Sequence, residues 1–124
     1  QMIRTLDSTL KDWNIPQEKL LLITYSRSMI QEAKKLNIDA RLSFEIVGEL
    51  ENGVKWCKSQ GIDILTIKPK LIDAATVKQL HADGFEIITF GAKSRSGNKK
   101  LLELNPDAIQ TNNVSALNRL LGKN

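Results

Sequence analysis

The sequence predicts an α/β fold in which a parallel sheet of about five strands alternates with helices. Two observations carry this prediction. Short runs rich in Leu and Ile recur along the chain, and segments with apolar residues at helical spacing separate them. The connections are short, and neither a low-complexity stretch nor a linker interrupts the pattern. We therefore expect a single α/β domain over residues 1–124.

The first half of the chain begins with a helix and then alternates between strands and helices. Leu6, Leu10 and Trp13 stand at i, i+4 and i+7, the spacing of one face of a short helix. The run KLLLITY is a continuous apolar stretch, typical of strands that are covered on both faces. These patterns predict helices over 5–13, 26–36 and 50–60 and strands over 19–25 and 41–47.

The second half continues the same alternation. Apolar runs predict strands over 62–67, 85–90 and 108–111, and helical spacing predicts helices over 73–82 and 114–121, with a short helix before Pro106. Asn112 or Asn113 can cap the last helix. Strand, helix and strand of these lengths suggest a right-handed βαβ unit. The core is expected to contain aliphatic strand residues: Leu21, Ile23, Ile46, Leu65, Ile67, Ile87, Ile88 and Ile109.

Composition excludes several classes of function. The net charge of +4 and the pI near 9.3 would help anionic ligands approach, but they are modest for a nucleic-acid-binding protein, and no aromatic residues interleave with the basic cluster. No apolar run approaches the roughly 20 residues of a membrane span. No signal peptide is visible, although the chain begins one residue before Met2 and reads as a piece of a longer protein, whose localisation stays unknown.

The chain offers few groups for chemistry. Cys57 is the only cysteine, so an intramolecular disulfide and a thiolate metal cluster are both excluded within one chain. His81 is the only histidine and falls mid-helix, where a structural role is the simpler interpretation. Glu45 is a single carboxylate in a strand, a poor site for a hard cation that binds six or more oxygens. We expect neither a catalytic residue nor a metal site in this chain.

The pattern and spacing of two segments resemble the end of the glycerophosphodiester phosphodiesterases. Segment 84–111 is similar to the family's Gly-x-x-Val-x-x-Trp-Thr followed by Val-Asp-x-Ile-x-Thr-Asp, with departures at Phe90, Gly91, Asn112 and Val114. Its matching residues are Gly84, Ile87, Phe90, Asp107, Ile109 and Thr111. TVKQLHADGFEI, residues 76–87, resembles the helix-to-strand step before it. Thr24-Tyr25 stands at a Ser-Phe position of the family.

The resemblance implies the later part of a TIM barrel, strands four to eight of eight. The complete family hydrolyses glycerophosphodiesters with a divalent cation, calcium or magnesium, but its His-Arg and Glu-x-Asp motifs are absent from this chain, which has one histidine where the family uses a pair. The resemblance therefore implies a phosphodiesterase-like domain that is inactive on its own. The alternative is a non-catalytic α/β module, derived from that barrel, that binds a ligand or self-associates. The barrel's missing N-terminal portion or a second copy of the chain is the expected partner.

Binding residues are expected at the carboxyl ends of the strands, where parallel α/β proteins hold ligands. Tyr25, Lys68 and Phe90 are predicted to line a substrate pocket; for Tyr25 and Phe90 the family resemblance implies this role, and core packing is the alternative. Lys93, Arg95 and Asn113 are predicted to bind an anion, such as a phosphate-bearing small molecule. A mobile, solvated basic loop with Lys93, Arg95, Lys99 and Lys100 is the alternative there.

Overall fold

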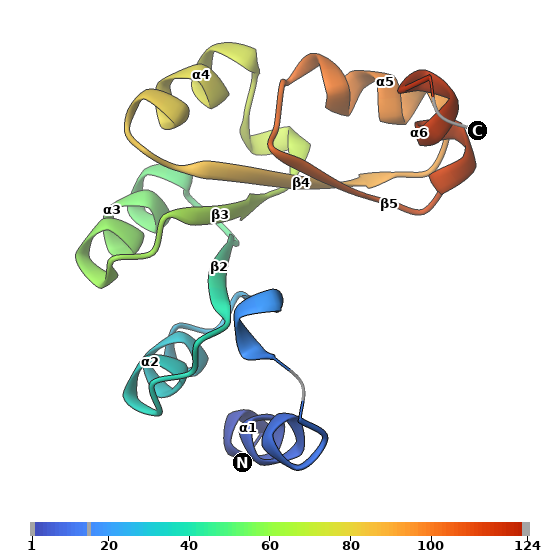
Figure 1. Ribbon diagram of the computed structural model, residues 1–124. Helices are drawn as coiled ribbons and strands as arrows, with labels where there is room; N and C mark the ends of the chain where they lie inside the picture. The colour runs from blue at the N-terminus through green and yellow to red at the C-terminus, as the bar shows by residue number, and fades with distance from the viewer. Residues whose placement is uncertain (1, 15, 123–124) are drawn as a thin grey trace. The chain divides into compact units, whose positions relative to one another are not determined.

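The computed structural model describes residues 2–14 and 16–122, and helices alternate with strands throughout them (Figure 1). The helices are α1 (Met2–Asp12), α2 (Arg27–Lys35), α3 (Leu50–Gln60), α4 (Ala74–Ala82), α5 (Arg95–Glu103), α6 (Val114–Leu120) and the short 3-10 helices η1 (Gln17–Lys19) and η2 (Pro69–Leu71). The strands are β1 (Leu21–Thr24), β2 (Arg41–Ile46), β3 (Ile64–Ile67), β4 (Glu86–Ala92) and β5 (Ala108–Thr111).

The strands form one five-stranded sheet in the order β1-β2-β3-β4-β5. β1 pairs with β2, β3 with β4 and β4 with β5, and each of these pairs is parallel. Sequential parallel strands need a crossover between them, and the intervening helices supply it. The predicted α/β class and parallel sheet are therefore confirmed.

The chain divides into two compact units, Gln1–Glu45 and Ile46–Asn124. The single domain expected over residues 1–124 stays a prediction.

In the first unit, α2 packs its buried residues Ile30 and Ala33 inward. Ser26 begins the helix, because its Oγ accepts a hydrogen bond from Met29 N at 3.3 Å. The sequence prediction is wrong for Leu21, which was expected in the core but is 41% exposed, because β1 is an edge strand. The helix predicted over 5–13 ends at Asp12, and Trp13 after it is 72% exposed.

Ile23, also expected in the core, is half-buried in the same strand. The side chain of Leu10 lies outside the described residues. Arg4 Nε and Glu32 Oε1, which lie 3.3 Å apart, form an exposed ion pair between α1 and α2.

The second unit contains most of the buried aliphatic residues. All four residues of β3 are buried, and Ile46, Leu65, Ile67, Ile87 and Ile88 lie in the core as predicted. Ile109 is only half-buried, because β5 is the other edge strand. Figure 1 shows α4 and α5 on the same side of β4. Gly53 allows α3 to approach Ile46 closely, since a Cβ there would lie 2.9 Å from two of its carbons.

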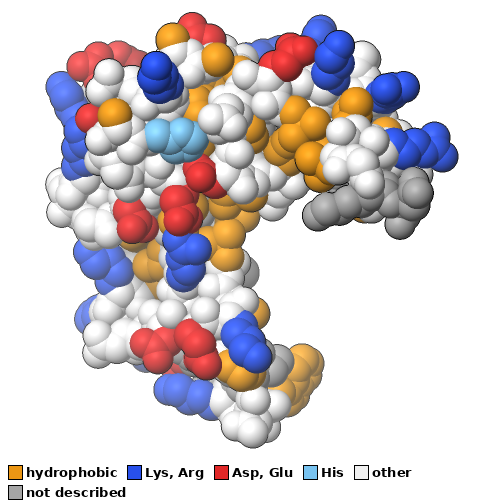
Figure 2. All heavy atoms as spheres, turned by 45° about the horizontal axis from the view of Figure 1, so that its top comes forward, with side chains coloured by type: hydrophobic (Ala, Val, Ile, Leu, Met, Phe, Trp, Pro, Cys, Tyr) orange, Lys and Arg blue, Asp and Glu red, His pale blue; other side chains and the backbone are white. Residues whose placement is uncertain are grey.

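Asp107 joins three segments of this unit. Its Oδ2 accepts a hydrogen bond from Ile87 N at 2.6 Å and lies 2.7 Å from His81 Nε2 of α4. Its backbone N donates to Ile87 O at 2.8 Å. The histidine, pale blue in Figure 2, lies at the surface next to an acidic side chain. These contacts hold α4, β4 and the entry to β5 together.

Candidate functional site

An open pocket lies where β3 and β4 end. Lys68, Pro69, Lys70, Phe90 and Gly91 line it, and its volume is about 410 Å³. The register of the two strands explains why these residues meet. Thr66 pairs with Ile88, and Lys68 and Phe90 each stand two residues further on, so they share one face of the sheet. The pocket is therefore at the carboxyl end of the strands, where parallel α/β proteins bind ligands.

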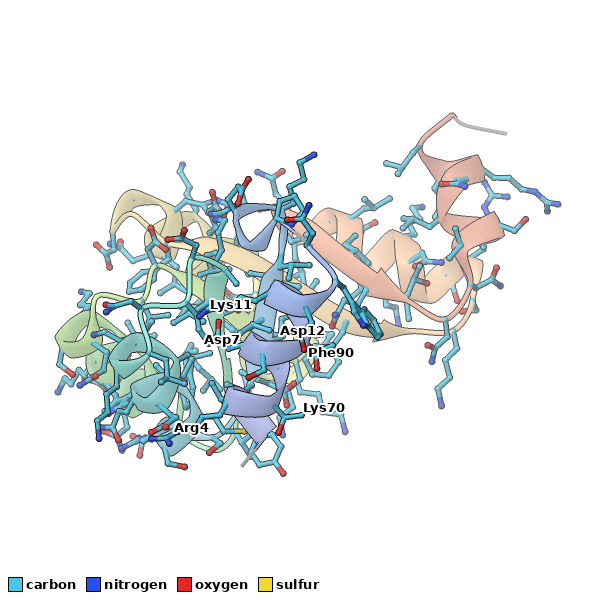
Figure 3. All side chains as sticks on the ribbon, turned by 60° about the horizontal axis from the view of Figure 1, so that its bottom comes forward. Arg4, Asp7, Lys11, Asp12, Lys70 and Phe90 are labelled. Atoms are coloured by element: carbon cyan, nitrogen blue, oxygen red, sulfur yellow. The ribbon has the colours of Figure 1, made fainter. Side chains whose placement is uncertain are left out.

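Each side of the pocket is shaped by a local backbone feature. On the β3 side, Pro69 begins the short helix η2, which follows Lys68 directly and carries Lys70. On the β4 side, Gly91 has a positive φ of 99°, and the register with β5 shifts between Phe90 and Ala92. Such a bulge re-aims the side chains next to it. Figure 3 labels Lys70 and Phe90, which line the pocket from its two sides.

The pocket suits an anion that carries a carbon skeleton. Lys68 and Lys70 are exposed and each ammonium brings three hydrogen-bond donors and one positive charge. Phe90 is half-buried and presents an apolar ring for carbon atoms to pack on. The described lining residues include no Asp or Glu, so nothing among them neutralises the two lysines. A phosphate ester has both features that this arrangement complements.

Two of the three predicted substrate residues thus meet in one pocket. Tyr25 follows β1 in the first unit and is 71% exposed. Its role in substrate binding stays a prediction.

The predicted basic loop is wrong in its extent. Arg95, Lys99 and Lys100 lie on helix α5, and only Lys93 and Ser94 separate this helix from β4. The helix begins this early because Ser94 Oγ accepts a hydrogen bond from Gly97 N at 3.1 Å. Lys93 and Arg95 are exposed. They lie at the carboxyl end of β4, as expected, and their anion-binding role stays a prediction.

Asn113 is the cap of α6, one of the two candidates named from the sequence. Its Oδ1 accepts a hydrogen bond from Ala116 N at 3.0 Å, and its backbone O accepts one from Asn98 Nδ2 at 3.2 Å. Both oxygens of Asn113 therefore serve the fold. An anion at this residue would have to use its other polar groups.

The divalent cation that the family resemblance implies does not fit the residues that the structure describes. Within residues 2–14 and 16–122, no group of three or more His, Cys, Asp or Glu side chains could hold a metal ion. Calcium or magnesium needs six or more oxygen ligands. His81 is hydrogen-bonded to Asp107, as a structural histidine would be. Nor does any helix in those two ranges have the length and apolar character that crossing a membrane requires.

Sequence reasoning missed Pro69, Lys70 and Gly91 as lining residues. The signal for the first two was present, because Lys-Pro-Lys directly follows a fully apolar strand. The proline begins η2 directly after the strand, so both lysines lie at its carboxyl end. The position of Gly91 depends on the irregular pairing of β4 with β5, and no local sequence pattern predicts that irregularity.

Comparison with known proteins finds solved structures that share this fold. No protein-family model matches the sequence, and no curated protein matches it. Solved structures do match. A phosphodiesterase of Oleispira antarctica in complex with the product sn-glycerol-3-phosphate superposes with a TM-score of 0.80 at 15% identity, covering 98% of this chain and 50% of that chain. A glycerophosphodiester phosphodiesterase of Parabacteroides distasonis gives 0.77 at 14% identity, with 97% and 50% covered.

This chain therefore spans about half the length of the structures it matches. At such low identity the likeness shows the fold alone. The shared fold confirms the resemblance seen in the sequence, which is to the later part of a glycerophosphodiester phosphodiesterase barrel.

Proposed function

We propose that this chain is the later part of a glycerophosphodiester phosphodiesterase-like barrel and holds the phosphate-bearing part of a substrate. The observation that carries the proposal is the Lys68–Lys70–Phe90 pocket at the carboxyl ends of β3 and β4. Two ammonium groups beside an aromatic ring complement a phosphate attached to a short carbon chain. The fold supports the same class, since one matching phosphodiesterase was solved with sn-glycerol-3-phosphate bound.

The residues present in this chain indicate which part of the reaction it would serve. This part of the barrel supplies cations and an aromatic wall, whereas the carboxylates and the histidine pair of the resembled family would come from the remaining strands. In this proposal the chain binds and orients the phosphate, and the other half brings the calcium or magnesium ion and the acid–base groups.

The test is a titration of the chain with sn-glycerol-3-phosphate, followed by backbone amide shifts in NMR spectra. The amides of Lys68, Lys70, Phe90 and Gly91 should shift first. Lys70→Gln should weaken binding about fivefold at low salt, because it removes one of the two pocket cations that attract the phosphate. Lys78→Gln, which removes an exposed lysine on α4 outside the pocket, is the matched control and should leave the affinity unchanged. No shift at millimolar ligand would overturn the proposal.

Lys93, Arg95 and Asn113 belong to the same proposal as a neighbouring anion site. Lys93 follows Phe90 by three residues, and Arg95 opens α5. Titration with inorganic phosphate should shift their amides, and Arg95→Gln should reduce those shifts. If the shifts of Lys93 and Arg95 stay flat while the pocket responds, this second site is wrong and the pocket stands alone.

The alternative function is a non-catalytic module that binds a ligand or self-associates, and the two edge strands favour its self-associating form. β1 and β5 stand at the ends of the sheet order, and each has a strand neighbour on one side only. An unpaired strand edge can pair with another chain. Titration with ligand also separates the two candidates, because a purely self-associating module would show no amide shifts in the pocket.

A further inference from the structure

We infer that the Lys68–Lys70–Phe90 pocket selects phosphodiesters whose alcohol carries no positive charge, and disfavours those with a quaternary ammonium group. The inference rests on the proposed function and adds the substrate class of the same site. It concerns the group attached to the far side of the phosphate, such as glycerol or inositol on the one hand and choline on the other.

The charges around the pocket carry the argument. Lys68 and Lys70 are both exposed lining residues, and they flank Pro69 on one wall. The described lining residues have no carboxylate, so a ligand cation would find no counter-charge among them. Asp73, the nearest acidic residue after Lys70 in the sequence, uses Oδ1 to accept hydrogen bonds from Thr76.

Phe90 favours the opposite specificity, which is binding of an ester with a quaternary ammonium group. Aromatic rings attract quaternary ammonium groups, and a half-buried ring gives a weak form of this contact. Two like charges that line the same pocket outweigh one such contact at a partly exposed ring, because the repulsion acts from both lysines at once. An uncharged polyol meets no repulsion, and its carbon atoms can still pack on the ring. The pocket therefore discriminates by charge, with the ring as a neutral wall.

The experiment compares two diesters that differ in this group. The 124-residue chain is titrated with glycerophosphoglycerol and with glycerophosphocholine, and both dissociation constants are taken from the amide shifts of Lys68, Lys70, Phe90 and Gly91. We expect the choline ester to bind about fivefold more weakly at low salt. The ratio should shrink at high salt, since ions screen the exposed lysines.

Variants separate charge from shape. In the Lys68→Gln, Lys70→Gln double variant the two diesters should bind within about twofold of each other, because the repulsion is gone while Phe90 remains. Lys78→Gln should retain the wild-type ratio. Unchanged amide spectra outside the pocket show that the variants are folded.

The outcomes distinguish this inference from the proposed function. Equal affinities in the wild-type chain, or tighter binding of the choline ester, would overturn the inference and leave the phosphate-binding function standing. Discrimination that survives the double variant would also overturn it, since the lysines would not be its source. Absence of any binding by both diesters would overturn the proposed function together with the inference.

Discussion

Asp107 is a single residue on which three segments converge. Its carboxylate accepts from Ile87 N and lies within hydrogen-bond distance of His81, while its own backbone N donates to Ile87 O. Ile87 is fully buried, so its N–H has little access to water if the carboxylate is removed. A buried N–H group that loses its acceptor destabilises the folded state. The loss is smaller when the group left behind can form a hydrogen bond with water.

We expect Asp107→Ala to lower the free energy of unfolding by about 1–2 kcal/mol, more than His81→Ala, which leaves only a partly exposed carboxylate group unpaired. Urea unfolding of both variants measures the difference. Asp107→Asn is the control, because it keeps an oxygen that can accept from Ile87 N. A larger loss in His81→Ala than in Asp107→Ala would contradict this account of the contact.

At the scale of elements, α4 depends on a charged cap. Asp73 Oδ1 accepts from Thr76 N and from Thr76 Oγ1, both at 2.7 Å. The backbone bond from Thr76, followed by its side-chain bond, holds the pKa of the Asp73 carboxyl below its ordinary value of 3.8. The folded state therefore releases this proton more readily than the unfolded state does. The stabilisation is present above the unfolded pKa and is lost as the pH falls through the folded pKa.

The expected outcome concerns the acid limb of the stability curve. As the pH falls through the ordinary carboxyl pKa of 3.8 and below it, the wild-type chain should lose more stability than Asp73→Asn, whose side chain caps a helix without titrating. Chemical unfolding at several pH values measures both curves. Parallel curves for the two proteins would mean that the Asp73 cap does not contribute to the acid dependence.

Helix α3 depends on the absence of a side chain at Gly53. A Cβ there would meet Cγ1 and Cγ2 of Ile46 at 2.9 Å, and Ile46 is buried and cannot move freely. Alanine favours a helix over glycine by about 1 kcal/mol, but overpacking costs about 1–3 kcal/mol. We expect Gly53→Ala to lower the thermal midpoint.

The control for Gly53→Ala is a double-mutant cycle. Ile46→Ala opens space for the new methyl group, so the two substitutions together should cost less than their sum. Circular dichroism melts of the four proteins give the cycle. If Gly53→Ala raises the midpoint, helix propensity outweighs the contact with Ile46.

For the molecule as a whole, the sheet order leaves β1 and β5 each with one strand neighbour. Unpaired edges template association, so we expect the isolated chain to form a homo-oligomer or to bind the missing part of the barrel. Light scattering across a concentration series checks this. Ala108→Lys places a charge on an exposed position of β5 and should shift the equilibrium towards monomer. A wild-type chain that stays monomeric throughout the series would refute the expectation.

Catalysis is the second property of the whole chain. The chain has one histidine and neither a His-Arg nor a Glu-x-Asp motif, so we expect that the isolated chain does not hydrolyse glycerophosphocholine or glycerophosphoethanolamine with calcium or magnesium. Two copies would not help, because neither carries the missing motifs. The assay includes His81→Ala as a control. Metal-dependent turnover that this variant abolishes would make His81 a catalytic residue and refute the structural role assigned to it.

The sequence by itself determined the alternation of helices and strands, because apolar periodicity and capping residues act over a few neighbouring positions. It placed the buried strand β3, the helix beginning after Asn113 and the carboxyl-end positions of Lys68 and Phe90. It also produced the family resemblance that the fold confirms.

Only the tertiary structure decided which of these residues meet. Lys70 and Phe90 line one pocket, and Asp107 contacts His81 across 26 residues, because parallel pairing brings together segments that are distant in sequence. The same structure left Leu21 exposed and Ile109 half-buried, although their local patterns resemble those of core strands. Periodicity shows that a strand has an apolar side. Whether that side is covered depends on the neighbours that the strand order provides, and β1 and β5 have one each.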